Sequence, residues 1–243
     1  MKVSIIVPCY NSMEYIDQCI DSVLAQDYDN YEVYLYDNES TDGTIEHIQA
    51  RASQNRLLNV VSVKNVYPNS YREAFEHAFE NIETDYLTFV ASDDFLSANY
   101  ISNCMEIISS NPNKIKCIQS PFVGVKGDVE VNSQKHEYKS LKEFKKMCLT
   151  SSPVNTPTVI YHKSLYKFLY MKAHEENEVT CSGAEDYDMF CNLADNNIFI
   201  YPVPVHLGYY YRWHDGQCTW KVHKDPKNYD VIIQNYWKKR WTS

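Results

Sequence analysis

Strand-like and helix-like segments alternate four times in the first 110 residues, and this alternation constrains the fold more than any other feature of the sequence. Four short apolar runs are predicted strands, and each precedes a segment of helical periodicity; the runs are residues 3–8, 31–36, 59–63 and 86–90. After the first run, Ile16, Ile20 and Val23 recur at a spacing that places them on one helix face. The pattern predicts an α/β fold with a doubly wound, mostly parallel sheet.

Local signals set two further expectations for helices in this first half. Asn11, with Glu14 three residues later, is predicted to cap the first helix in a capping-box arrangement. The third helix is predicted over residues 70–82, with Ala74 and Phe79 turned toward the core.

After residue 112 the rhythm changes. Residues 117–125 and 129–131 are predicted to form a hairpin added to the edge of the sheet. The other expected elements are helices over 140–149 and 183–196, a strand over 156–161, a strand-rich aromatic run over 198–213 and a C-terminal helix. An antiparallel portion is therefore expected beside the parallel sheet.

Charge and cysteine content exclude several classes of protein. Lys and Arg total 23 against 32 Asp and Glu, a net charge of −9, which argues against a nucleic-acid partner. None of the eight cysteines forms a C-x-x-C pair, so we expect reduced thiols in a cytoplasmic protein.

The first strand follows Met1-Lys2 directly, and no apolar stretch reaches the ~20 residues of a membrane span. We expect a chain that is soluble or held at a membrane surface.

Polar and aromatic residues follow three of the predicted parallel strands. These segments are Pro8-Cys9-Tyr10-Asn11, Asp37-Asn38 and Ser92-Asp93-Asp94. Because the carboxyl ends of such strands meet at one crevice, the three segments are expected to lie together. An aromatic face, a single acid and an acid pair suit a nucleoside diphosphate with Mg²⁺ or Mn²⁺ on its phosphates. Ordinary turn and cap chemistry is the alternative for each segment taken singly, and the chain has neither a dinucleotide nor a Walker-type glycine motif.

Four motifs in order resemble those of the inverting glycosyltransferases of family 2, which have the GT-A fold. They are V-S-I-I-V-P-C-Y-N, E-V-Y-L-Y-D-N-E-S-T-D-G-T, V-A-S-D-D and G-A-E-D-Y-D-M-F, and together they span residues 3–190. The resemblance implies a GT-A sheet with an added antiparallel acceptor-side portion. It divides the chain into a donor-binding half, residues 1–112, and an acceptor-binding half with the C-terminal helix, residues 113–243.

The resemblance also implies where the nucleotide of the donor binds. In the family, the segment that matches Asp37 holds the nucleobase, usually uracil, although this loop reads Asp37-Asn38-Glu39-Ser40 where D-D-G-S is common. Arg72 falls where the family often has an arginine for the phosphates; an exposed helix arginine is the alternative. The full set of expected nucleotide-binding residues is Pro8, Tyr10, Asn11, Asp37, Arg72, Ser92 and Asp93.

The resemblance further implies the metal ligands and the catalytic base. Asp93 matches the last Asp of the family's D-x-D element, which coordinates Mg²⁺ or Mn²⁺, whereas Ala91 replaces the first Asp. His214 lies in a segment similar to R-x-H and is expected at the metal or the pyrophosphate. Glu185 and Asp186 of the E-D element are the expected catalytic residues, and Asp186 matches the general base; helix capping is the alternative for this acid pair.

On the acceptor side, Asp94 and Trp213 are expected to contact the acceptor. The C-terminal helix ends Tyr236-Trp237-Lys238-Lys239-Arg240-Trp241, an aromatic and basic composition typical of a membrane interface. A peripheral contact with the inner face of the membrane is one expectation, and a helix packed on the domain with a solvated basic end is the other.

The sequence thus predicts a metal-dependent inverting glycosyltransferase, acting in polysaccharide biosynthesis for the cell envelope. It would move a hexosyl or N-acetylhexosaminyl group from a nucleotide donor, expected to be UDP-linked, to a hydroxyl of a glycan or lipid-linked saccharide. A non-catalytic nucleotide-sugar or glycan-binding module is the alternative that Ala91 favours. A nucleotidyltransferase is disfavoured, because the loop after the first strand is not rich in Gly and Arg.

Overall fold

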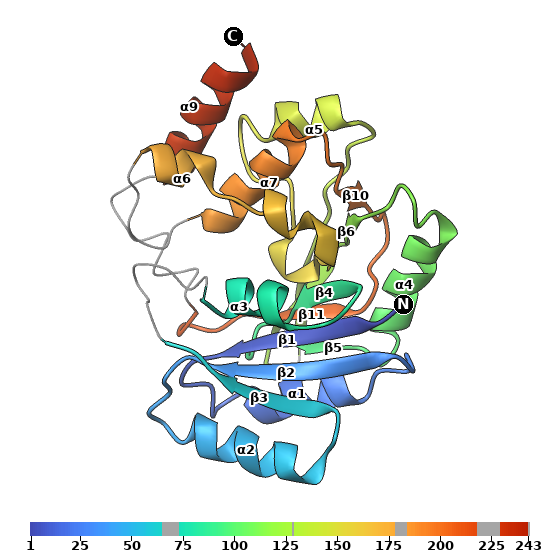
Figure 1. Cartoon of the computed structure of the whole chain (residues 1–243), viewed down its shortest axis with the longest axis vertical. Coiled ribbons are helices and arrows are strands. Elements are labelled where there is room, and N and C mark those ends of the chain that lie inside the picture. Colours follow the sequence, from blue (N-terminus) through green and yellow to red (C-terminus); the bar gives the residue numbers. More distant parts are fainter. Residues whose placement is uncertain (65–72, 128, 178–183, 218–228, 243) are drawn as a thin grey trace.

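The computed structural model describes residues 1–64, 73–127, 129–177, 184–217 and 229–242, and a seven-stranded sheet runs through its centre (Figure 1). The strand order is β10-β6-β9-β4-β1-β2-β3. The strands are β1 Val3–Cys9, β2 Tyr31–Asp37, β3 Leu58–Ser62, β4 Tyr86–Phe89, β6 Cys117–Gln119, β9 Ile160–His162 and β10 Tyr201–Pro202. The first four strands pair in parallel, whereas β9 is antiparallel to both β4 and β6.

Helices cover both faces of this sheet, as expected when strands are apolar on both sides. In β1, Val3 and Ile5 pack in one buried cluster with residues of α1 and α4, whereas Ile6 packs in the other with residues of α3 and α7. The first four helices are α1 Ile16–Leu24, α2 Thr44–Gln54, α3 Glu73–Asn81 and α4 Tyr100–Ser110. The predicted doubly wound α/β fold is confirmed.

A second, four-stranded sheet has the order β5-β11-β7-β8. Its strands are β5 Phe95–Leu96, β7 Phe122–Lys126, β8 Val129–Gln134 and β11 Tyr209–Arg212. The prediction of one hairpin at the edge of the main sheet is therefore wrong. Only residues 117–119 join the main sheet, and the chain leaves it at Pro121, which has no N–H for a ladder. The β7–β8 hairpin then pairs with β11 in the second sheet.

The remaining elements form a helical layer against one face of the main sheet (Figure 1). They are α5 Leu141–Met147, η1 Thr156–Thr158, η2 Lys163–Phe168, α6 Lys172–Glu176, α7 Glu185–Asp195 and α9 Tyr229–Thr242. The predicted strand over 156–161 is partly wrong. Its first three residues form the 3₁₀ turn η1, in which the Thr158 hydroxyl donates to the backbone carbonyl of Asn155 at 2.9 Å, and β9 begins only at Ile160.

One helix start differs from the sequence prediction, and a second is not tested. Helix α1 begins at Ile16, and its N-cap residue Tyr15 makes no side-chain cap bond, so the capping role of Asn11 is wrong. Asn11 instead has a left-handed backbone (φ 49°), and its Oδ1 accepts from the backbone N–H of Thr41 at 2.8 Å. The described part of α3 begins at Glu73, and the start predicted at residue 70 lies outside the described residues.

The C-terminal helix buries three of its large apolar residues in the protein, whereas its Val231 is exposed. Tyr229, Ile233 and Trp237 are buried, and the Trp237 side chain is fully enclosed. No helix in the described ranges has the length and apolar character needed to cross a membrane. The predicted membrane contact finds no support in this packing, and the alternative of a helix packed on the domain describes α9.

A buried carboxylate joins α9 to the rest of this layer. Asp188 of α7 has no exposed surface, and its Oδ1 accepts from the indole N–H of Trp237 at 2.8 Å. Its Oδ2 accepts from the backbone N–H of His174 in α6 at 2.9 Å and lies 2.9 Å from Nδ1 of the same residue. One side chain therefore holds three helices together.

We predict that Asp188→Ala lowers the free energy of unfolding by about 3–5 kcal/mol, because it leaves buried donors on two helices without their acceptor. Urea unfolding followed by circular dichroism measures the change. Glu106→Ala, at an exposed position of α4, is the control and is expected to stay within about 0.5 kcal/mol of the unchanged protein. Equal stabilities for the two variants would contradict the prediction.

Candidate functional site

The sheet topology brings four segments to one edge. Strands β4, β1 and β2 are parallel neighbours, with Ile6 beside Phe89 and Cys9 beside Asp37, so their carboxyl ends lie together. Strand β9 runs antiparallel to β4, with Ile160 beside Thr88, so its amino end lies at the same edge. The loops after β1, β2 and β4 and the turn before β9 therefore meet.

The loop after β2 presents a buried carboxylate oxygen. Asp37 is 3 % exposed, and its Oδ2 accepts from the backbone N–H of Ser40 at 3.2 Å. Its Oδ1 is buried without a hydrogen-bond partner among the described residues. Such an atom is costly to leave unpaired, so the site favours a ligand that brings an N–H or O–H donor. Tyr10 is half exposed at the end of the neighbouring strand, and Pro8 lies in β1 beside Tyr36.

Hydrogen bonds fix the loop after β1 to the loops on either side of it. The backbone N–H of Asn11 donates to Oγ of Ser40 at 3.0 Å, and Oδ1 of Asn11 accepts from the backbone of Thr41. On the other side, the hydroxyls of Ser12 and Ser92 lie 2.7 Å apart. The loop after β1 is thus bonded directly to the loops after β2 and β4, with which it was predicted to converge.

A carboxylate and an imidazole meet beside these loops. Oδ2 of Asp93 lies 2.9 Å from Nε2 of His214, although the two residues are 121 positions apart in the chain. Both side chains keep some exposure, 26 % for Asp93 and 20 % for His214. Arg212 supports the pair, because its Nε donates to the Asp93 carbonyl at 2.6 Å. The Tyr15 ring lies 4.6 Å from the His214 ring and 4.9 Å from the Arg212 guanidinium carbon.

Asp94 has a different role from the one predicted. Its side chain is completely buried; Oδ2 accepts from the Tyr209 hydroxyl at 2.7 Å and Oδ1 from the Arg212 backbone N–H at 2.8 Å. Burial, and then the nearby Asp93 charge, raises the pKa of this carboxyl well above its usual range. The predicted contact between Asp94 and an acceptor is wrong, because an enclosed side chain cannot meet one. Asp94 instead ties β11 to the end of β4.

The donor set at Asp93 and His214 fits a divalent cation. Carboxylate oxygen is the ligand that Mg²⁺ and Mn²⁺ prefer, and imidazole nitrogen also binds transition metals. At 2.9 Å the two atoms are hydrogen-bonded to each other, and a cation bound by both would replace that hydrogen bond. The described residues contain no cluster of three or more His, Cys, Asp or Glu side chains able to hold a metal, so these two would bind it together with ligand oxygens.

The acid pair of α7 lies at the start of that helix. Ala184, the N-cap residue, has a left-handed backbone (φ 54°), which is rare for a residue with a side chain and occurs most at functional sites. Glu185 is buried, whereas Asp186 is partly exposed, so Asp186 is the acid that a second molecule can reach. The Thr156 hydroxyl donates to Oδ2 of Asp186, and the helix dipole favours its charge.

Thr156 places Asp186 relative to the sheet. It begins η1, just before β9, and the amino end of β9 lies at the edge where β4 ends. Asp37 ends β2, Asp93 follows β4, and Asp186 is bonded to the turn before β9. All three acids therefore lie at the same edge of the main sheet. Sequence reasoning did not identify Thr156, because it stands in no motif and its contact with Asp186 crosses 30 positions.

The other predicted residues are less informative. The Trp213 ring lies 5.0 Å from the Tyr211 ring, and the Trp213 backbone N–H donates to the carbonyl of Val125 at 2.8 Å. Its contact with an acceptor stays a prediction. Arg72 lies outside the described residues. Tyr15 was not predicted, and no periodicity or motif would have separated it from the other surface positions of the first helix.

Comparison with known proteins gives this geometry its context. The relatives include the poly(ribitol-phosphate) beta-N-acetylglucosaminyltransferase TarS of Staphylococcus aureus, 28 % identical over 130 residues, which are 52 % of this chain and 22 % of TarS. The chondroitin synthase of Pasteurella multocida is 25 % identical over 193 residues, or 79 % of this chain and 19 % of that protein. The chain spans 14 to 40 % of the length of the first three curated relatives.

Solved structures share the fold. The structure of S. aureus TarS 1–349 in complex with UDP-GlcNAc matches 89 % of this chain and 60 % of that one, with a TM-score of 0.66 and 23 % identity. The structure of the mannosyltransferase PcManGT of Pyrobaculum calidifontis, in complex with GDP-Man and Mn²⁺, matches 96 % of this chain and 68 % of that one. Its TM-score is 0.58 and its sequence identity 14 %. The family model described as "Glycosyl transferase family 2" matches residues 4–174. This chain, with its GT-A fold, belongs to glycosyltransferase family 2.

Proposed function

We propose that this chain is a metal-dependent inverting glycosyltransferase that moves a sugar from a UDP-linked donor to a hydroxyl of a glycan or lipid-linked saccharide. The observation that carries the proposal is the gathering of Asp37, the Asp93–His214 pair and Asp186 at one sheet edge. Asp37 would serve the nucleotide, the Asp93–His214 pair the cation, and Asp186 the reacting hydroxyl. Residues 1–112 would hold the donor, and residues 113–243 would form the acceptor side.

The donor nucleotide would lie over the ends of β1 and β2. Oδ1 of Asp37, buried without a described partner, would accept from the N–H of a uracil, and the half-exposed Tyr10 ring would offer a face for the base. Relatives support the nucleotide, because TarS has been solved with UDP and with UDP-GlcNAc. The poly(ribitol-phosphate) in the name of TarS and the chondroitin in the name of the Pasteurella enzyme support a polymeric acceptor or product, and we propose a polysaccharide of the cell envelope.

Asp93 and His214 would hold the cation. When bound, Mg²⁺ or Mn²⁺ would supply positive charge that stabilises the departing diphosphate. Ala91 stands where the family's D-x-D element has its first Asp, so of that element's two acids this chain keeps Asp93 as the metal ligand. Binding of Mn²⁺ by PcManGT, which has the same fold, supports this assignment.

Asp186 would act as the general base. Its partly exposed carboxylate would take the proton from the acceptor hydroxyl as that oxygen attacks the anomeric carbon of the donor sugar. The bond from that carbon to the diphosphate breaks on the opposite face, so the configuration inverts. The Thr156 hydroxyl donates to Oδ2 of Asp186, and the backbone N–H of Tyr187 donates to Oδ1 at 2.8 Å. These two bonds orient the carboxylate, and the remaining lone pairs of its oxygens would accept the proton.

A non-catalytic sugar-binding module is the second candidate, and Ala91 is the observation that favours it. The intact Asp186, held by Thr156 at the same edge as the metal-binding pair, favours catalysis. Slow hydrolysis of a UDP-sugar, measured by release of UDP, separates the two, since a binding module releases none.

Asp186→Asn is expected to reduce transfer by a factor of about 10²–10⁴, because the amide cannot accept the proton. Nucleotide binding should remain unchanged, since Asp186 does not contact the nucleotide in this proposal. Initial rates of sugar transfer and calorimetric titration with UDP measure the two effects. Asp29→Asn, at an exposed position before β2, is the control. An Asp186→Asn enzyme with native rates would remove Asp186 from this role.

Mn²⁺ is expected to tighten UDP binding, and Asp93→Ala or His214→Ala should each cut that gain by about tenfold or more. Calorimetric titration with UDP, with and without Mn²⁺, gives both affinities. His47→Ala, on α2, should behave as the unchanged protein. If Mn²⁺ leaves the UDP affinity of the unchanged protein the same, the metal assignment is wrong.

A further inference from the structure

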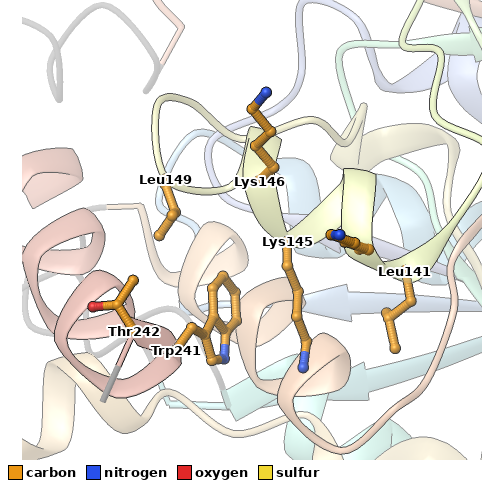
Figure 2. A pocket seen from close by; sticks show the side chains of 7 residues that line it. Leu141, Lys145, Lys146, Leu149, Trp241 and Thr242 are labelled. Atoms are coloured by element: carbon orange, nitrogen blue, oxygen red, sulfur yellow. The ribbon is translucent and has the colours of Figure 1, made fainter.

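A groove lies between α5 and the end of α9 (Figure 2). Its volume is about 370 Å³. The lining residues are Leu141, Lys142, Lys145, Lys146, Leu149, Trp241 and Thr242. The proposed transfer reaction uses none of them.

Positive charge is concentrated on the α5 wall. Lys142, Lys145 and Lys146 occupy positions i, i+3 and i+4, so one side of the helix carries all three. Within the described ranges, none of the three lies in an ion pair with a carboxylate. On a chain of net charge −9, such a cluster is a local exception that attracts anions.

Trp241 forms a fixed apolar wall opposite these lysines. Its indole N–H donates to Oδ1 of Asp195 at 3.1 Å, and its ring lies 5.2 Å from the buried Trp237 ring. The Lys145 ammonium lies over this indole, with its Nζ 5.4 Å from the ring centroid, whereas Lys146 points away from it (Figure 2). The groove therefore offers a flat apolar surface next to ammonium groups.

We propose that this groove binds an anionic polysaccharide, with carboxylate or phosphodiester groups at the lysines and a sugar ring against Trp241. A flat indole packs against the C–H face of a sugar, and ammonium groups attract its anionic substituents. A membrane surface fits less well, because Ile233 and Trp237 of α9 are buried in the protein and Val231 is the large apolar residue of this helix that is exposed.

Both walls of the groove are attached to the helix that carries Asp186. The Tyr187 hydroxyl donates to the carbonyl of Cys148, just after α5, and Asp195 binds Trp241 of α9. Helix α7 has 11 residues and so spans roughly 16 Å. On the basis of the proposed function, the bound polymer is a distal part of the acceptor, whose end reaches Asp186.

Binding is measured first, without donor. Fluorescein-labelled polygalacturonate carries carboxylates, poly(glycerol phosphate) carries phosphodiesters, and dextran is neutral. The protein is expected to bind at least one anionic polymer and not dextran, more weakly at higher salt. Lys142→Ala with Lys145→Ala should weaken that binding about tenfold. The control is Lys114→Ala with Lys126→Ala, which removes the same charge at exposed positions elsewhere.

Three outcomes overturn the proposal: neither anionic polymer binds, the two double variants bind equally, or only vesicles containing phosphatidylglycerol bind through these lysines. Thermal unfolding of both double variants checks that each is folded. UDP-sugar hydrolysis should be equal in the two, since it needs no acceptor. Loss of polymer binding with hydrolysis intact thus tests the groove, whereas absence of hydrolysis in every variant, the unchanged protein included, counts against the transferase.

Discussion

The buried carboxylate of Asp94 is the interaction on which the site depends. Tyr209 and Arg212 of β11 both donate to it, so the end of β4 and a strand more than 100 residues later are held together. Because an enclosed acceptor must be fully paired, this contact tolerates little displacement. It brings Arg212 and His214 to Asp93, and without it the first and second halves of the chain would not share a site.

A second buried acid has the same effect on the helical layer. Asp188 binds Trp237 and His174, and so orients α7 against α6 and α9. Asp186 lies in the first turn of α7, two residues before Asp188. The position of the proposed base therefore depends on the hydrogen bonds of Asp188 to His174 and Trp237. Buried polar groups in this protein thus lie beside the acids of the candidate site and hold the elements that carry them.

Much of the fold follows from local patterns. The apolar runs and the helical stripes of the first 110 residues predict β1 to β4 and α1 to α4, because each pattern fixes which faces must be buried. The second half was predicted less well. The hairpin was assigned to the wrong sheet, because pairing partners such as β11 are distant in sequence and periodicity carries no information about them.

The candidate site divides in the same way. The sequence alone determined the family, the strand ends that carry Asp37 and Asp93, and the acid pair at 185–186, because these are local motifs with a fixed relation to strand and helix. Only the tertiary structure decided that Asp94 is enclosed while its neighbour Asp93 is open, that Thr156 holds Asp186, and that Trp237 is covered. The physical reason is that burial and hydrogen bonding depend on packing between segments that are distant in the sequence. Two adjacent Asp residues therefore look alike in the sequence, although packing buries one and leaves the other exposed.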